Sequence, residues 1–238
     1  MNKRGVGHIE MILAFLLFVS ATITIFSIFN VQQQTTTHES SISYVSYEIA
    51  KRASITVVAY SVALNNTAIS QQEIIAIELP QEIPLEWGVR AENYSGALLP
   101  SRISEQRNTV FVKRGGSSFF YLTTSEDIPP SGEQFLTLPN VNASYYRIAS
   151  MDEKTFLSEK RVRALNASYY ADYPDFKRQL KVSNRLDFTF SLTFDTRDFI
   201  NAARDIPSRT EVLVKTQRQE VLRETGGKAF ADFSVKLW

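Results

Sequence analysis

The chain has 238 residues, with 26 basic and 25 acidic side chains and no cysteine. This length suffices for one folded domain with an anchor, or at most for two small domains. The lack of cysteine excludes disulfides, cysteine-based zinc sites and thiol nucleophiles. Because the charges balance, no basic surface for nucleic acid is expected, and nucleic acid is not a predicted partner.

An apolar run without a charged residue extends from Met11 to Val31. In a helix, about 20 such residues cross the core of a bilayer. Lys3 and Arg4 precede the run, and the next basic residue is Lys51. The positive-inside rule therefore predicts a single span in the cell membrane, with a cytoplasmic N-terminus and an extracellular C-terminal domain. Two plain interpretations are a cleaved secretory signal, for which the run is long, and an uncleaved anchor.

A carboxylate, Glu10, stands directly before this run. An acid near lipid is costly and by default marks a functional position, although at a helix N-terminus the helix dipole favours it. The surrounding sequence, "KRGVGHIEMILAFLLF", resembles the processing site of type IV prepilins and archaeal class III signal peptides. In that family a short basic leader ends in Gly, a membrane-embedded peptidase cuts after it, and the fifth mature residue is Glu. Gly5, Val6 and Glu10 match these positions.

The resemblance implies cleavage between Gly5 and Val6, and a Glu10 that neutralises the N-terminal amine of a neighbouring subunit. It also implies three kinds of partner: membrane lipid, the prepilin peptidase, and pilin-like subunits in a homo- or hetero-oligomer. Val6 departs from the usual first residues, which are Phe or Met in bacterial pilins and often Gln in archaeal ones. The apolar run also lacks the proline that is common in bacterial pilin stems. These departures favour the archaeal side or a divergent minor pilin.

The predicted fold class is an N-terminal transmembrane α-helix followed by a mainly-β, sandwich-like ectodomain with short helical insertions. The predicted segments are a cleavable leader at 1–5, a transmembrane and assembly helix at 6–31, a stalk or linker at 32–66, and a β-rich extracellular domain at 67–238. Within the stalk, the first half of 44–66 can be helical, whereas 55–64 is β-branched enough to be a strand.

Hydrophobic periodicity and turn residues divide the β-rich domain further. Strands are predicted at 73–80, 133–139 and 185–195. Hairpins are predicted at 108–124 around "RGGS" and at 210–238 around "TGG". Helices are predicted at 150–165, where Ser150 and Glu153 have the spacing of a capping box, at 172–182 and at 196–207.

Four asparagines stand in N-x-S/T sequences and are candidate N-glycosylation acceptors: Asn65, Asn93, Asn142 and Asn166. The alternative is that they are ordinary polar loop residues. The only histidines are His8 and His38, and no G-x-S-x-G motif or phosphate loop occurs. We therefore predict no catalytic residues, no metal site, no cofactor and no enzymatic activity.

These features predict a pilin-like subunit, such as a minor pilin or pseudopilin, of a type IV pilus-related filament with a structural or adhesive role. The alternative is a single-span, membrane-anchored surface protein whose β-domain binds a ligand or partner and forms no filament. An exported enzyme has the least support, because the scattered carboxylates give no reason to choose a catalytic pair.

Overall fold

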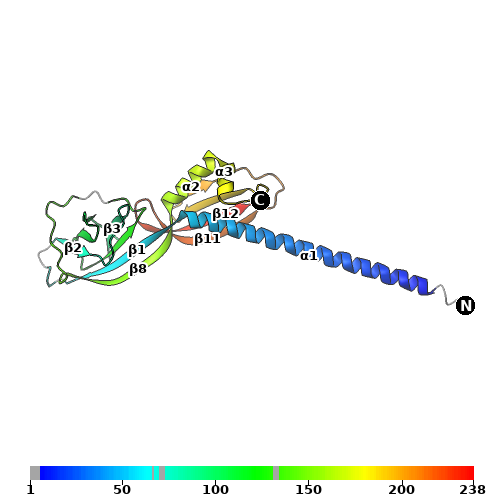
Figure 1. The fold of residues 1–238 in the computed structure, drawn as a ribbon, viewed down its shortest axis with the longest axis horizontal. Coiled ribbons are helices and arrows are strands. Elements are labelled where there is room, and N and C mark those ends of the chain that lie inside the picture. Colours follow the sequence, from blue (N-terminus) through cyan, green and yellow to red (C-terminus); the bar gives the residue numbers. More distant parts are fainter. Residues whose placement is uncertain (1–5, 66, 70–72, 131–133) are drawn as a thin grey trace.

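The computed structural model describes residues 6–65, 67–69, 73–130 and 134–238, with the backbone alone at 6–9 and 27–38. Its longest element is helix α1, Val6–Ala53. At 1.5 Å per residue, its 48 residues extend for about 72 Å. The helix projects from one end of a β-rich body, so that the molecule is elongated and the C-terminus lies beside the helix (Figure 1).

Helix α1 continues well beyond the predicted boundary at residue 31 and runs directly into strand β1, Ser54–Leu64. The predicted stalk at 32–66 is therefore mostly helix followed by strand. Of the two possibilities that the sequence of 44–66 left open, the first half is helix and 55–64 is strand. The helix persists because its last turns bury an apolar stripe, Ile42, Val45 and Ile49, at the spacing of successive helical turns. Tertiary packing of such a stripe outweighs weak local helix propensity.

No helix has an apolar stretch long enough to cross a membrane, within the part of the chain whose side chains are described. The transmembrane part of the predicted fold class is therefore not confirmed. Residues 27–31 of the predicted span lie outside the described side chains. The mainly-β character of the remaining chain is confirmed, since twelve strands and two short helices follow α1 among the described residues.

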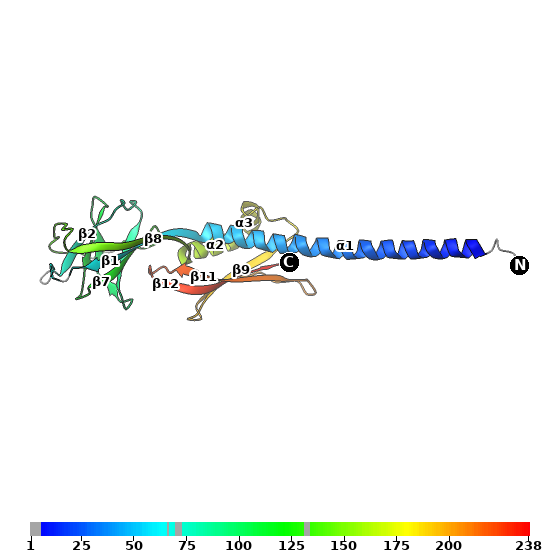
Figure 2. The same cartoon turned by 90° about the horizontal axis from the view of Figure 1, so that it is seen from below.

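The proximal lobe lies next to the projecting part of α1. It contains the C-terminal part of α1, helices α2 (Glu159–Ala171) and α3 (Tyr173–Gln179), and strands β9 (Phe188–Phe194), β10 (Phe199–Ala202), β11 (Leu213–Leu222) and β12 (Lys228–Leu237). The strands form an antiparallel sheet in the order β10-β9-β12-β11. Inward side chains of this sheet share one core with all three helices. The helices therefore cover one face of the sheet and leave the other open (Figure 2).

The distal lobe lies at the end of the molecule that is farthest from the projecting part of α1 (Figure 1). It contains β1, β2 (Ile74–Glu78), β3 (Gly88–Asn93), β4 (Leu98–Leu99), β5 (Ser101–Ile103), β6 (Thr109–Lys113), β7 (Phe119–Ser125) and most of β8 (Tyr146–Ser158). A three-stranded sheet, β2-β6-β5, shares a core with the sheet that contains β1, β7 and β3. Only two residue pairs, between β8 and β11, join the strands of the two lobes into one nine-stranded sheet.

Several predicted elements match the structure. The strands at 73–80 and 185–195 are β2 and β9, the hairpin at 210–238 is β11–β12, and the helix at 172–182 is α3. The two β arms at 108–124 also exist, as β6 and β7, but the predicted hairpin is wrong. The arms belong to different sheets, because β6 pairs with β2 and β5 whereas β7 pairs with β1 and β3.

Three other predictions were wrong. The segment 150–157 is not helical but belongs to β8, where Asp152, Glu153 and Lys154 pair with β1. The helix at this place is α2, which begins at Glu159 and is capped by Ser158. The helix predicted at 196–207 is a turn followed by β10. No strand occurs among the described residues of 133–139.

Candidate functional site: the first helix and the joint between the lobes

The first part of α1 is an exposed apolar surface. Ten large apolar side chains between Met11 and Phe26 are each at least 53 % exposed. Folded soluble proteins rarely expose a contiguous apolar patch of this kind, and such patches mark contacts with protein or membrane. This part of the helix therefore needs a partner that its own chain does not supply.

The few hydroxyl groups of this surface are already satisfied. Ser20 donates to the carbonyl of Leu17 at 2.9 Å, and Thr24 donates to that of Ser20 at 2.8 Å. Thr22 makes the same kind of bond, to the carbonyl of Phe18 at 2.7 Å. Because these back-bonds consume the donors within the helix, the surface presents little unsatisfied polarity to lipid or to another helix.

The predicted processing and assembly residues lie at the tip of α1. Gly5 lies outside the described residues, and Val6 is the first residue of the helix. Glu10 is exposed and follows Val6 by four residues, so both positions lie on one face of the helix. The side chains of His8 and His38 are outside the described part.

The second part of α1 is held firmly against the proximal lobe. Ile42, Val45 and Ile49 are buried in its core. Two polar contacts add to this packing: Lys215 Nζ donates to Ser43 Oγ at 3.1 Å, and the Arg52 guanidinium donates to the carbonyl of Gln179. These contacts fix the direction in which the exposed part projects.

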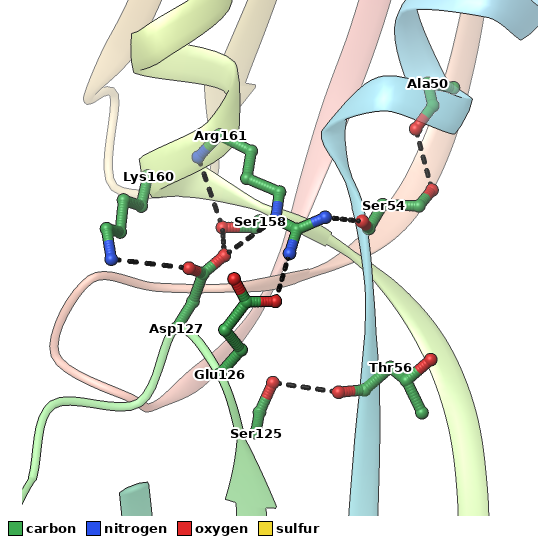
Figure 3. A network of polar contacts seen from close by, with 9 residues as sticks. All are labelled: Ala50, Ser54, Thr56, Ser125, Glu126, Asp127, Ser158, Lys160 and Arg161. Atoms are coloured by element: carbon green, nitrogen blue, oxygen red, sulfur yellow. Dashed lines mark hydrogen bonds and ion pairs between the residues drawn. The ribbon is translucent and has the colours of Figure 1, made fainter. Parts of the chain in front are cut away.

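A network of charges, which we term the joint, connects the two lobes where α1 passes into β1 (Figure 3). At its centre Asp127, from the loop after β7, has a side chain only 6 % exposed. Its Oδ2 accepts a hydrogen bond from Ser158 Oγ at 2.6 Å and lies 3.3 Å from Arg161 Nε. The same Ser158 oxygen caps α2 by accepting from the Arg161 backbone N–H. The distal lobe is thereby tied to the start of α2.

Arg161 links three segments at once within the joint. One of its terminal nitrogens donates to the carbonyl of Ser54 at 2.8 Å, and the other donates to Glu126 Oε2 at 2.6 Å. Ser54 is the first residue of β1, and its hydroxyl donates back to Ala50 of α1 at 2.7 Å. The passage from helix to strand is therefore held from both lobes.

A second buried acid secures the β11–β12 turn to α2. The side chain of Glu159 is 4 % exposed. Its Oε2 lies 2.9 Å from Arg223 Nε, and its Oε1 lies 2.7 Å from a terminal nitrogen of Arg163. The hydrogen bond to Glu159 raises the pKa of Arg163, and the Arg223 guanidinium lies 3.9 Å from the centre of the Phe194 ring. The two arginines together compensate the buried charge of Glu159, and loss of both would leave it unpaired.

A third polar cluster anchors α3 to the sheet. Tyr173 Oη donates to Asp187 Oδ1 at 3.0 Å and accepts from the Phe188 N–H, while Lys177 Nζ donates to Asp187 at 2.9 Å. Burial raises the pKa values of Tyr169 and Tyr173. Partial burial of Asp187 opposes its charge, but the hydrogen bonds from Lys177 and Tyr173 prevail and lower its pKa. The cluster therefore keeps Asp187 charged and serves as a structural contact between α3 and the sheet.

Three of the four candidate glycosylation acceptors share one local geometry: Asn65, Asn93 and Asn142. In each, the hydroxyl of the residue two positions later donates to the asparagine side-chain oxygen, at 3.1, 2.7 and 2.8 Å in chain order. All three belong to the distal lobe, and Asn65 also donates to the carbonyl of Ser144. These turns keep the motif compact at the surface.

Asn166 differs from the other three acceptors because it lies within helix α2. Ser168 donates to the carbonyl of Ala164 at 3.0 Å and not to the asparagine. The side-chain oxygen of Asn166 is buried and has no hydrogen-bond partner among the described residues. Its environment is thus that of a packed helix and not of a surface loop.

Sequence reasoning missed the joint. Asp127 and Arg161 are 34 residues apart, and no spacing rule connects an acid in a loop with a base on a later helix. A partial signal was present in Ser158, which has the residue type preferred at a helix N-cap. Among the described residues, no group of three or more metal-ligating side chains gathers. Comparison with protein-family models, with curated proteins and with solved structures finds no match for this chain.

Proposed function

We propose that this protein is a pilin-like subunit of a type IV pilus-related filament, with a structural or adhesive role. The observation that carries the proposal is the division of α1 into an exposed apolar part and a part buried against the proximal lobe. An N-terminal helix of this kind can be held by lipid and then by the helices of other subunits. The order Gly5, Val6, Glu10 supports the same proposal.

In the proposed pathway, a prepilin peptidase cleaves after Gly5, and α1 stays in the membrane with the sandwich-like β-lobes outside the cell. Assembly then exchanges lipid for neighbouring helices around the apolar side chains. Burial of each large side chain contributes about 1.5–3 kcal/mol relative to water, and lipid offers a similar gain. Apolar packing therefore cannot set the register of the helices by itself.

Glu10 supplies the register in this proposal. Its carboxylate would pair with the Val6 amine of an adjacent subunit, inside a bundle of apolar helices. A charge pair in such surroundings depends strongly on geometry, and loss of one partner leaves the other uncompensated. The pair therefore selects one alignment of neighbouring helices and adds little net attraction.

The alternative is a single-span surface protein with a ligand-binding β-domain and no filament. It needs the same apolar anchor but gives Glu10 no partner. The two proposals differ in what happens when Glu10 is replaced, whereas membrane attachment is common to both.

We expect Glu10→Ala to remain in the membrane fraction but to fail to enter filaments or higher oligomers, as measured by shearing and by crosslinking in cells. Glu39→Ala, at another exposed acid of α1, is the matched control and should assemble normally. Normal assembly of Glu10→Ala would contradict the charge-pair mechanism. Absence of any assembly in the unaltered chain would favour the alternative.

A further inference from the structure

The open face of the proximal-lobe sheet contains a hollow of about 380 Å³, across β10, β9 and β12. None of the ten residues that line it is an acid. The helices lie against the opposite face of this sheet (Figure 2). On β9, the lining residues alternate with Phe188, Phe190 and Leu192, which belong to the core shared with the helices. Cavities of a few hundred Å³ with a few convergent polar groups are typical of small-ligand sites.

Polar side chains form the floor of the hollow. Thr189 lines it and is only 7 % exposed. Ser191 and Thr193 follow at alternate positions of β9, and Asn201 stands beside Ser191 on β10. Because hydroxyl and amide groups both donate and accept hydrogen bonds, the arrangement suits a ligand that supplies many donors and acceptors.

An apolar wall stands at one end of this floor. Phe199 pairs with Thr193 and is 67 % exposed. Ile206 adds a second apolar side chain to the lining. An exposed aromatic ring beside an array of hydroxyl and amide groups fits a ligand with one apolar face and a polar rim. A sugar ring has this character, since its C–H bonds form faces and its hydroxyl groups point from the edge.

Positive charge stands at the other end. Lys236 pairs with Thr189 across β9 and β12, and its side chain is exposed and in no ion pair with the described residues. Arg204 also lines the hollow, but its guanidinium lies 4.2 Å from the centre of the Tyr173 ring and interacts with Asp187 of the α3 cluster. Lys236, with no carboxylate in the lining, favours an anionic group on the ligand.

We propose that this hollow binds an acidic saccharide, in which a hexuronate carboxylate meets Lys236 and a sugar face rests on Phe199. The inference deepens the adhesive form of the proposed function by naming the class of ligand, but binding by a single chain does not require filament assembly. Failure of one proposal is therefore distinguishable from failure of the other.

The test uses the full chain in a neutral detergent, with oligogalacturonate as the ligand and its methyl ester as the uncharged match. Calorimetric titration should show saturable binding to oligogalacturonate. The affinity for the methyl ester should be about tenfold lower. Lys236→Gln should remove that preference and leave binding of the ester unchanged. Lys154→Gln, an exposed lysine outside the hollow, should change neither.

The aromatic wall is tested separately. Phe199→Ala should weaken binding of both the acid and the ester by about tenfold. Phe230→Ala is the matched control, because Phe230 is also exposed but does not line the hollow. Circular dichroism should show all four variants folded, as expected for surface positions.

Three results would overturn the proposal. One is the absence of saturable binding to both saccharides. Another is equal affinity for polyglutamate, which would show attraction to polyanions without recognition of sugar. The third is self-association of the protein as its own concentration is raised, if Phe199→Ala and Lys236→Gln both weaken it. That result would make the hollow a contact between copies of this chain.

Discussion

Helix α1 contains two parts that differ in how their apolar side chains are used. From Met11 to Phe26 almost every side chain is apolar, and the large ones are exposed. From Ile42 to Ala53 the composition is mixed, and the apolar stripe is buried. A stripe at helical spacing finds its partner within its own chain, whereas a helix that is apolar all round needs lipid or other helices. The spacing of apolar residues along a helix, more than their total number, therefore indicates whether the helix packs within its own chain or against another molecule.

The largest expected difference in stability is between two isoleucine-to-alanine substitutions, one in the buried part of α1 and one in the exposed part. Ile49→Ala should lower the free energy of unfolding of the proximal lobe by about 2–5 kcal/mol, since Ile49 is fully buried. Ile23→Ala should change it by less than about 0.5 kcal/mol, because Ile23 is 61 % exposed. Urea titration of both variants in neutral detergent measures the difference. Equal losses would show that the exposed part is also packed within a single chain.

An intermediate effect is expected at the joint, where the buried part of α1 ends. Arg161→Met leaves Asp127 with the more exposed Lys160, 3.5 Å from its Oδ1, and should cost about 2 kcal/mol in thermal unfolding. Arg178→Met is the control, since its ion pair with Asp175 is exposed and contributes at most about 0.5 kcal/mol. If the two variants unfold alike, the joint does not hold the lobes together.

The smallest effect concerns the charge that anchors α3 beside the buried part of α1. The lowered pKa of Asp187 stabilises the fold at pH values above the unfolded pKa of Asp, and this contribution is lost as the pH falls through the folded pKa. Because Asp187 is half-exposed, Asp187→Asn should cost at most about 1 kcal/mol at pH 7. The variant should also lose less stability than the unaltered chain between about pH 5 and pH 2. Identical acid limbs for Asp187→Asn and the unaltered chain would contradict the assignment.

The sequence predicted those elements whose periodicity reflects a single buried face. Strand β9 alternates Phe188, Phe190 and Leu192 inward, and all three are buried. The β8 segment failed because residues 149–155 are exposed and carry helix-favouring charges, so that only pairing with β1 makes them a strand. The turn before β10 failed for a local reason, since Arg197 adopts a positive φ of 69° that its residue type does not announce.

The candidate site divides in the same way. Glu10 could be proposed from the sequence because it stands directly before the apolar run and close to Gly5 and Val6, and its role stays a prediction. The joint and the hollow could not be predicted from the sequence. Each combines side chains from separate strands or loops, which come together only in the folded chain. Asp127 with Arg161 is one such pair, and Thr189 with Lys236 is another.

Whether α1 is the stem of a processed pilin-like subunit is decided most directly by the intact mass of the protein, extracted from cells that contain a prepilin peptidase. We predict a chain that begins at Val6, lacks the five leader residues and retains the whole apolar helix. A chain that begins at Met1 or Asn2, under conditions in which the peptidase processes its other substrates, would contradict it.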